Sequence, residues 1–486
     1  MLGGESSKFQ LASSNEEEPF EPLANFLPLE LGTWPLELSS PPVPRSTAVE
    51  VARRLTDAGH EALLAGGCVR DKLLGRVPKD FDIATSATPA RVLSLFPGSN
   101  EVGAHFGVVI VKLGDHHVEV ATFRTDGSYK DGRRPDSVEF STPPEDAQRR
   151  DFTVNGLFEN PFTGEVIDFV GGLADIKTKT LRAIGDPVAR FREDSLRLLR
   201  AVRFATVLGF EIEPLTWSAI QDHAGDLARI SPERIRDEFS KLIAAPDRAR
   251  GLDLLVQSGL IREIIPEVLP MIGCEQPPEW HPEGDVYTHT RIMLEMLGPD
   301  APLELCLAVL LHDIAKPPTF TFDEAANRIR FNGHDALGAT IAEEILRRLK
   351  YPNGVIAAVV SMVARHMQFM NVQKMRVAKL KRFMAEPTFE QEMELHRVDC
   401  GSSNGFTDNY EFLIEKRGEF ANEPLIPPAL VSGKDLIAMG TTPGPRFKNL
   451  LEAIQTEQLE GRLHDRETAL ELLRTLVSSP DATESA

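Results

Sequence analysis

The chain has 486 residues, of which 42% are hydrophobic and 26% are charged, and this length predicts two or more domains rather than one core. The formal net charge of −20 argues against broad, non-specific binding to nucleic acid but leaves room for a local basic surface. The first residues do not resemble a secretory signal, and we expect no apolar run of the roughly 18 residues that span a membrane. Four cysteines without CxxC spacing predict reduced thiols, so we expect a cytoplasmic protein with no membrane partner.

The first 44 residues contain an acidic run and several prolines, and we expect them to form a disordered leader. Ser46 is expected to cap the first helix, which would end at Gly59. The pattern then changes from mixed strands and helices to helices alone. The expected boundaries are 1–44 for the leader, 45–175 for the mixed unit, 176–275 and 276–425 for two helical domains, and 426–486 for a helical tail.

A pair of aspartates closes the stretch LAGGCVRDKLLGRVPKDFDIATSA, residues 64–87. On an expected strand over 79–85, Asp80 and Asp82 point to the same face, because side chains alternate along a strand. Two neighbouring carboxylates repel each other unless a cation lies between them, and hard divalent metals prefer such oxygen ligands. A solvated Asp-x-Asp at a loop edge is the alternative, and the glycines and the Arg-Asp pair upstream argue against it.

A third carboxylate is expected near this pair. Residues 106–113 and 117–123 have the pattern of two antiparallel strands, and Glu119 would lie on the polar side of the second one. Three carboxylates can form a two-metal site that activates a hydroxyl and neutralises a leaving pyrophosphate. The turn at Gly66 and Gly67 would let backbone amides approach a triphosphate, and Arg70 would add a phosphate contact.

Two further segments carry charged residues with an expected binding role. A helix is expected over 145–158, which contains the triplet Arg149-Arg150-Asp151. A second helix is expected over 186–205, where Asp194 and Arg197 would be neighbours on one face. Taken alone, such a pair predicts an ordinary surface ion pair, which contributes little to stability. Its donor and acceptor also match an exocyclic amine beside a ring acceptor, which both cytosine and adenine present.

Five blocks in the chain resemble, in order and spacing, the signature of a known enzyme family. They are the stretch at 64–87, VEVATFRT at 118–125, RRDFTVNGL at 149–157, DPVARFREDSLRLLRAVRFA at 186–205 and ISPERIRDEFSKLI at 230–243. The family is that of class II tRNA nucleotidyltransferases and bacterial poly(A) polymerases. The resemblance covers about residues 46 to 275. It implies a polymerase β-like α+β head with a small mixed sheet, a helical nucleotide- and RNA-binding body, and the substrates tRNA, CTP and ATP with Mg²⁺.

The resemblance also implies roles for individual residues. The metal-binding and catalytic residues would be Asp80, Asp82 and Glu119. The nucleotide-binding residues would be Gly66, Gly67, Arg70, Arg149, Arg150, Asp151, Asn155, Glu193, Asp194, Arg197 and Arg200. A carboxylate in the 149–151 block would select ribonucleotides, and Glu193, Asp194 and Arg197 would read the base without a template.

The loop at 125–135, TDGSYKDGRRP, bears on which product is made. It resembles the flexible loop of CCA-adding members, and members that add only CC lack it. The resemblance therefore favours addition of CCA to the tRNA 3′ end. An enzyme that adds only A and a poly(A) polymerase remain as alternatives, although the acidic charge and the absence of a basic C-terminal extension weaken the second.

A second set of residues resembles the H…HD…H…H…D pattern of the HD phosphohydrolase superfamily. Its members are His289, His312, Asp313, His334, His366 and Asp399. Such ligands on separate helices can converge on one or two divalent metals and activate water, so the resemblance implies an all-α HD domain with phosphohydrolase activity. The alternatives are a helical domain that only packs against tRNA, an HD hydrolase whose head is inactive, and a non-catalytic RNA-binding protein.

Overall fold

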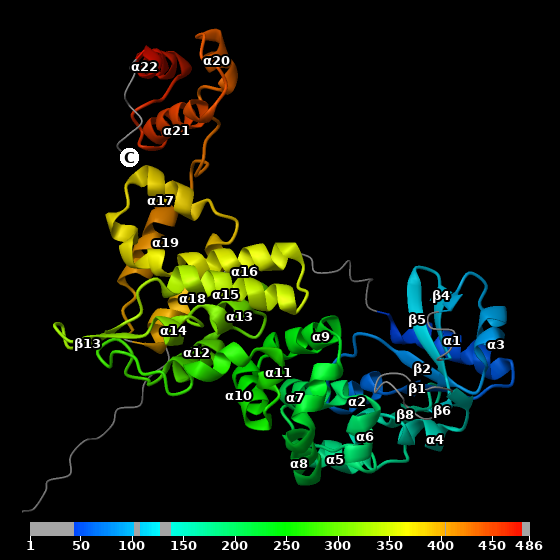
Figure 1. Ribbon diagram of the computed structural model, residues 1–486. Helices are drawn as coiled ribbons and strands as arrows, with labels where there is room; N and C mark the ends of the chain where they lie inside the picture. Colours follow the sequence, from blue (N-terminus) through cyan, green and yellow to red (C-terminus); the bar gives the residue numbers. More distant parts are fainter. Residues whose placement is uncertain (1–42, 102–106, 127–137, 404, 479–486) are drawn as a thin grey trace, which may run out of the picture. The chain divides into compact units, whose positions relative to one another are not determined.

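The computed structural model describes residues 43–101, 107–126, 138–403 and 405–478, and Figure 1 shows their helices and strands in chain order. The expected leader therefore lies outside the described residues, apart from its last two positions. Most of the loop at 125–135 lies outside them as well.

The head is built on a mixed seven-stranded sheet with the order β3-β4-β5-β2-β1-β8-β9. Strands β2 and β5 run parallel, and the other neighbouring pairs are antiparallel. The strands are β1 (Ala62–Ala65), β2 (Asp82–Thr85), β3 (Asn100–Glu101), β4 (Val108–Leu113), β5 (His116–Thr122), β8 (Leu157–Glu159) and β9 (Val166–Asp168). The expected antiparallel pair at 106–113 and 117–123 is confirmed as β4 and β5.

Helices cover the sheet because its strands alternate apolar side chains between two buried faces. On one face, Leu55 of α1 (Arg45–Asp57) packs in a cluster with Ile83 and Val120, and α3 (Pro89–Leu95) contributes to the same cluster. On the other face, Phe123 and Phe158 pack edge to face with ring centroids 6.1 Å apart. The α+β class expected for the head is therefore confirmed.

Of the helix expected over 145–158, only residues 145–148 belong to a helix, so this prediction is wrong beyond residue 148. The helix α4 (Pro143–Gln148) starts at a capping box between Thr142 and Glu145. The chain then turns through the short 3-10 helix η2 (Thr153–Asn155) and enters β8, which pairs with β1. Pairing with a distant strand outweighs the local helical preference, because it buries Leu157 and Phe158 in the sheet.

The body is helical, as expected, but its second predicted helix is broken. The chain forms α6 (Pro187–Glu193), then α7 (Leu196–Leu208), and between them Asp194 has the extended backbone angles φ −145° and ψ 104°. The Asp194 carboxylate accepts a hydrogen bond from the Leu196 amide and so caps the second helix. Asp194 and Arg197 therefore do not share one helical face, which corrects the expectation.

Three further helices and a 3-10 turn complete this part of the body. They are α8 (Pro214–His223) with the 3-10 turn η3 (Ala224–Arg229), α9 (Pro232–Ile243) and α10 (Arg248–Ser258). Two small pairs of strands interrupt the helical part: β10 (Thr180–Leu181) with β11 (Glu211–Ile212), and β12 (Thr321–Asp323) with β13 (Arg328–Arg330).

The expected HD domain is all-helical apart from the β12–β13 hairpin. Its main helices are α12 (Val286–Met296), α13 (Leu303–Leu311), α15 (His334–Arg348), α16 (Asn353–Arg365), α18 (Phe389–Ser402) and α19 (Asp408–Phe420). The tail has its own cluster of buried leucine and isoleucine side chains, formed by α20 (Gly433–Ala438), α21 (Pro445–Leu459) and α22 (Arg466–Ser478).

One helical stretch among the described residues, Asn353–Lys374, is long and apolar enough to cross a membrane by length and composition, which corrects the expectation that none would be. A core helix of a soluble domain meets the same criteria of length and composition. The stretch contains α16, which packs against α13 and α15 and buries Val359 and Met362.

A buried arginine joins the body to the next domain. Arg248 at the start of α10 is fully buried, and its guanidinium donates to carbonyl oxygens only. Nη1 lies 3.1 Å from the Leu297 oxygen and Nη2 lies 3.2 Å from the Gly298 oxygen, at the C-terminal end of α12. A cation stabilises the carbonyl groups at a helix C-terminus, which have no partner within the helix. The hydrogen bonds from Arg248 therefore hold the C-terminal end of α12 against α10.

Replacing Arg248 with methionine should lower the free energy of unfolding by about 3 kcal/mol, because several buried carbonyls lose their donors. Urea unfolding followed by circular dichroism measures this loss. Arg229→Met is the matched control, since that side chain is 74% exposed, and it should change stability by less than about 0.5 kcal/mol. An Arg248→Met protein as stable as this control would show that the carbonyl contacts contribute little.

Candidate functional site

The three carboxylates expected in the head meet at one end of the parallel strand pair. The register pairs Ile83 of β2 with Val120 of β5, so the preceding residues Asp82 and Glu119 lie side by side. Asp80 lies just before β2, which is shorter than the strand expected over 79–85. Phe81 and Ile83 face the hydrophobic core.

Desolvation and neighbouring carboxylates raise the pKa of both Asp82 and Glu119. Part of the Asp82 side chain reaches solvent, but protein atoms surround most of its carboxylate. This desolvation is the main cause that raises the pKa of Asp82 to about 6, and the nearby charge of Glu119 adds to it. Desolvation and the charge of Asp80 also raise the pKa of Glu119, against the opposing effect of Arg124 and Arg150. Oxygen ligands with this excess of negative charge suit a hard divalent cation, so the donor set fits a metal.

Gly66 brings the start of α2 (Gly67–Leu73) close to Arg150. Its φ of 73° is a conformation that favours glycine, and a Cβ atom there would lie 2.9 Å from Nη1 of Arg150. The Gly66 amide donates to the Leu157 oxygen at 2.9 Å, so this amide joins the two strands and does not point to a ligand.

A carboxylate that the sequence interpretation missed holds two of the predicted arginines. Asp146 on α4 is almost fully buried and pairs with Nη2 of Arg149 at 2.7 Å and with Nη2 of Arg150 at 3.0 Å. Burial alone would raise the pKa of Asp146, but the two guanidinium groups outweigh it and lower that pKa. The signal in the sequence was the spacing of three and four residues along a helical turn.

Asp151 lies at the centre of a buried polar network. Asn155 Nδ2 donates to Asp151 Oδ1 at 3.1 Å, and Arg70 Nη1 donates to Asn155 Oδ1 at 2.5 Å. Arg200 Nη2 lies 2.5 Å from Asp151 Oδ2, and its Nη1 reaches Glu238 of α9 at 3.5 Å. Burial opposes the charge of Asp151, but Arg200 and the hydrogen bonds hold its pKa well below the usual range. The structure thus links four predicted nucleotide-binding residues through hydrogen bonds.

The expected base-reading residues each have a partner. Arg234 of α9 contacts both carboxylate oxygens of Asp194, with Nη2 2.7 Å from Oδ2. Arg197 Nη1 lies 2.5 Å from Oε2 of Glu193, and its Nη2 donates to the Arg149 oxygen at 3.1 Å. Arg234 lies in the block ISPERIRDEFSKLI but was not singled out, because only tertiary packing places it beside Asp194.

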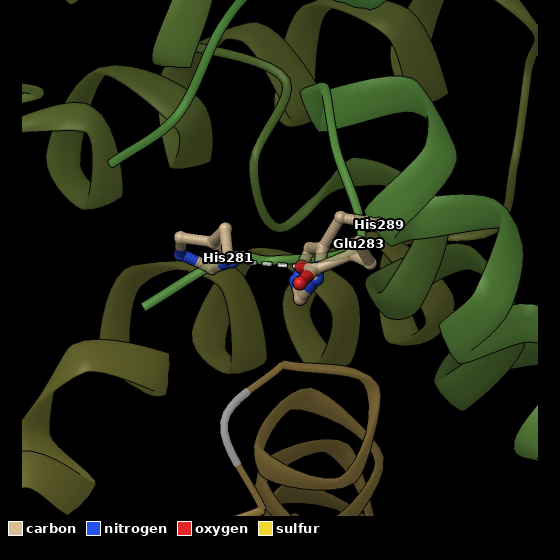
Figure 2. Close-up of side chains that lie close together, drawn as sticks. All are labelled: His281, Glu283 and His289. Atoms are coloured by element: carbon tan, nitrogen blue, oxygen red, sulfur yellow. Dashed lines mark hydrogen bonds and ion pairs between the residues drawn. The ribbon is translucent and has the colours of Figure 1, made fainter. Parts of the chain in front are cut away.

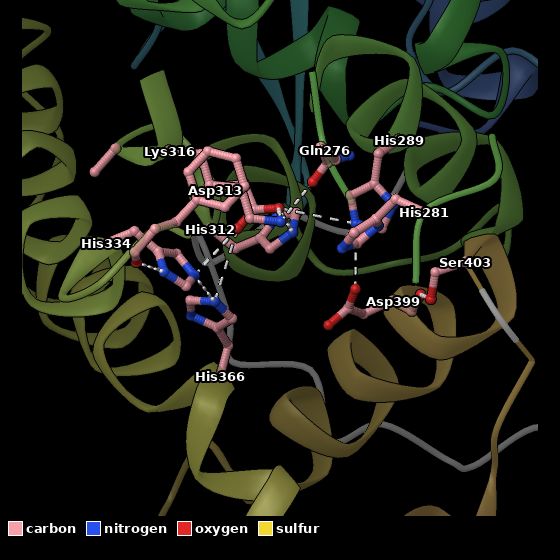
Figure 3. A network of polar contacts seen from close by, with 12 residues as sticks. Gln276, His281, His289, His312, Asp313, Lys316, His334, His366, Asp399 and Ser403 are labelled. Carbon is pink, nitrogen blue, oxygen red and sulfur yellow. Dashed lines mark hydrogen bonds and ion pairs between the residues drawn. The ribbon is translucent and has the colours of Figure 1, made fainter. Parts of the chain in front are cut away.

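The HD residues converge from five elements onto one buried cluster, which Figure 3 shows. His289 comes from α12, His312 and Asp313 follow α13, His334 opens α15, His366 follows α16 and Asp399 comes from α18. All six predicted ligands are therefore close together, and Asp313 lies at the centre.

One end of this cluster brings nitrogen lone pairs face to face. Nδ1 of His334 and Nδ1 of His366 each lie 2.7 Å from the backbone oxygen three residues earlier, so each Nδ1 carries the proton. Their Nε2 atoms, which then carry lone pairs, lie only 3.1 Å apart and face Oδ1 of Asp313 at 3.4 and 3.9 Å. Burial, with the nearby His312, lowers the pKa of His366 to about 4 and keeps its ring neutral. A divalent cation would relieve this repulsion.

A second cation position faces the other oxygen of Asp313. Nε2 of His312 lies 3.1 Å and Nε2 of His289 lies 3.9 Å from Oδ2 of Asp313, and all three atoms are buried. Asp399 Oδ1 is 3.2 Å from the same His289 nitrogen. Lys316, which the sequence interpretation missed, also contacts Oδ2 at 2.7 Å. The donor atoms fit one or two divalent metals that share Asp313.

Glu283 orients the first of these histidines, as Figure 2 shows. Its Oε1 lies 2.6 Å from Nδ1 of His289 and 2.9 Å from Nδ1 of His281. Although Glu283 is itself desolvated, the two histidine hydrogen bonds lower its pKa to about 2. A carboxylate on Nδ1 fixes the tautomer and directs Nε2 toward the metal position. Nothing in the periodicity of this loop indicated the role.

Three family models match the chain. They are the poly A polymerase head domain over residues 62–182, the probable RNA and SrmB-binding site of polymerase A over 209–272, and the HD domain over 285–398. Domains of the first and third kinds generally use divalent metals, which agrees with the donor groups in the HD cluster.

Curated relatives are similar over somewhat less than half of the chain. The CCA-adding enzyme of Geobacillus stearothermophilus is 45% identical over 218 residues, which is 45% of this chain and 54% of the relative. The CCA-adding enzyme of Lactococcus lactis subsp. cremoris strain MG1363 is 45% identical over 215 residues, 43% of this chain and 53% of the relative. The alignments thus span about half the length of these relatives.

Solved structures are similar over most of the chain. The Bacillus stearothermophilus CCA-adding enzyme in complex with CTP has a TM-score of 0.68 and 28% identity, covering 90% of this chain and 98% of that one. The Thermotoga maritima CCA-adding enzyme complexed with tRNA has a TM-score of 0.55 and 20% identity, covering 89% and 95%, and shows a shared fold.

Replacing Glu283 with alanine should weaken Mn²⁺ binding at the HD cluster about 10- to 100-fold, because His289 loses the carboxylate that orients it. Isothermal titration calorimetry measures the affinity, in a background with Asp80→Asn and Asp82→Asn that silences the head. Glu279→Ala is the control, since Glu279 lines the same cavity and belongs to none of the donor groups. Equal affinities in the two variants would contradict the orienting role.

Proposed function

We propose that this chain, which belongs to the family of class II tRNA nucleotidyltransferases and bacterial poly(A) polymerases, adds CMP and AMP to the 3′ end of tRNA without a nucleic-acid template. The observation that carries the proposal is the meeting of Asp80, Asp82 and Glu119 at one end of the parallel strands β2 and β5. The similarity to CCA-adding enzymes, one of them solved with CTP, supports it.

In the proposed reaction, the tRNA 3′-hydroxyl attacks the α-phosphate of CTP or ATP and pyrophosphate leaves. Asp80, Asp82 and Glu119 would hold Mg²⁺, which when bound supplies activation of the hydroxyl and neutralisation of the phosphate charge. Arg150 lies beside Gly66 and lowers the pKa of Asp82, so it is close enough to the carboxylates to contact a phosphate. Arg70 stays fixed through Asn155 and Asp71.

Base selection is assigned to the segment between α6 and α7. Arg197 would donate to the ring nitrogen of cytosine or adenine, and Asp194 would accept from the exocyclic amine. Their partners Arg234 and Glu193 hold both side chains in place before a nucleotide arrives, so little ordering is needed on binding. Uracil or guanine would instead place a carbonyl and a ring N–H against these groups, and this mismatch would select cytosine and adenine without a template.

The second cluster supports a separate activity. We propose that the HD domain is a divalent-metal phosphohydrolase, with His289, His312, Asp313, His334, His366 and Asp399 as ligands. The facing nitrogen lone pairs of His334 and His366 favour this over a domain that only packs against tRNA, because without a cation they destabilise the fold. We also propose a cytoplasmic location, which the four free cysteines support.

Replacing Asp82 with alanine should reduce incorporation of labelled CMP into tRNA that lacks its last three nucleotides by at least about 100-fold, because the metal loses a ligand. Asp115→Ala is the control, since Asp115 lies exposed in the turn between β4 and β5 and should retain full activity. Normal incorporation by the Asp82→Ala protein would refute the assigned site.

Replacing Asp313 with alanine should abolish the release of phosphate from a nucleoside 2′-monophosphate, because both proposed cation positions use this carboxylate. Colorimetric phosphate detection measures the release, and tRNA extension by the same protein shows that the head remains folded. Asp300→Ala, at an exposed position before α13, is the control. Equal phosphate release by the two variants would contradict the proposal.

A further inference from the structure

Asp146 holds two arginines of the head side by side at the end of α4. Arg149 directs Nε and Nη2 to Oδ1 of Asp146, at 2.9 and 2.7 Å. Arg150 directs the same two kinds of atom to Oδ2, at 3.1 and 3.0 Å. Each guanidinium group therefore presents one edge to the carboxylate, and each carboxylate oxygen receives one guanidinium group.

The position of Asp146 is itself fixed by the backbone. The capping box of Thr142 and Glu145 sets the start of α4, and spacings of three and four residues then bring both arginines to Asp146. The backbone amide of Arg124, the first residue of β6 (Arg124–Asp126), donates to Oδ1 at 3.3 Å. Asp146 is only 1% exposed, so water competes little for these contacts.

Further contacts orient Arg150 toward the carboxylates of the head. Its guanidinium carbon lies 5.0 Å from the centroid of the Phe158 ring, and its Nη1 donates to the Asn155 oxygen at 3.3 Å. The same Nη1 approaches Gly66, and the charge of Arg150 opposes the desolvation that raises the pKa of Asp82. Arg150 thus lies within electrostatic reach of the place where the proposed reaction puts the phosphates.

We propose that Asp146 is a positioning residue, which aligns the guanidinium groups of Arg149 and Arg150 for the triphosphate of the incoming nucleotide. The inference rests on the function proposed above and deepens it. Two guanidinium groups repel each other at close range, and the shared carboxylate holds them together. The three side chains keep a net positive charge for the phosphates, and their arrangement is set before the nucleotide arrives.

The sign of one measurement separates positioning from charge. Asp146→Asn removes a negative charge beside a site for an anion, so charge alone would strengthen the binding of CTP and of inorganic tripolyphosphate. Positioning predicts the opposite, because the guanidinium groups lose the carboxylate that aligns them, and both affinities should fall about tenfold. The preference for CTP over UTP should stay unchanged.

Isothermal titration calorimetry with Mg²⁺ measures these affinities without turnover, in a background with Asp313→Asn that silences the HD cluster. Asp175→Asn is the matched control, because Asp175 is another buried carboxylate of the head and pairs with Nε of Arg182 at 3.1 Å. It should leave both affinities within about twofold of the background protein.

A second variant keeps the test decisive if Asp146→Asn does not fold. Asp146→Glu retains the charge that the two arginines need but displaces both guanidinium groups by the length of a methylene group. Positioning predicts that the affinity for tripolyphosphate falls about threefold in this variant. A role in charge alone predicts no change.

Unchanged or stronger binding of tripolyphosphate by the Asp146 variants would overturn the positioning role, and so would equal losses in Asp146→Asn and Asp175→Asn. A simultaneous loss of the preference for CTP over UTP would also overturn it, because the whole site would then be disturbed. Weaker binding by the Asp146 variants, with no extension of tRNA by the wild-type protein, would support the positioning role and overturn only the function proposed above.

Discussion

Electrostatic repulsion between donor groups that the fold holds together is the constraint on which both sites depend. In the head, parallel strands place Asp82 beside Glu119, and desolvation with the neighbouring charge raises the pKa of Asp82 to about 6. In the HD domain, backbone carbonyls fix the tautomers of His334 and His366 so that two lone pairs meet at 3.1 Å. These repulsive contacts lower the free energy of unfolding, so packing in the surrounding core must compensate for them. A bound cation would offset the repulsion and raise the free energy of unfolding again.

A buried hydrogen-bond network lies in the head and extends into the body. In the head, Arg70, Asn155, Asp151 and Arg200 form a continuous chain of hydrogen bonds that ends at Glu238 of α9. This chain joins α2 and η2 of the head to α7 and α9 of the body. A buried polar network of this kind is stable only when every member has a partner.

Local patterns in the sequence predicted those features that local geometry determines. The β-branched runs indicated β4 and β5. The strand expected over 79–85 formed only from Asp82 onward, so Asp80 precedes β2. The end of the apolar helix α13 placed His312 and Asp313 at the cluster. The resemblance to a known family then supplied the roles that spacing alone could not.

Features that depend on distant partners were not predictable in this way. The break at Asp194 reflects Arg234, which lies 40 residues later in the chain. The segment after Gln148 forms a strand because β1 is available to pair with it. Glu283 lies in a loop without periodicity, and its role appears only when it contacts His289. Tertiary contacts override local preference at each of these positions.

The central claim is that the head builds the sequence CCA. Sequencing the 3′ ends of tRNA that lacked its last three nucleotides, after incubation with the protein, CTP, ATP and Mg²⁺, tests it most directly. The account predicts that most extended molecules end in CCA and that extension stops there. Ends that carry only A, or long runs of A, would contradict it.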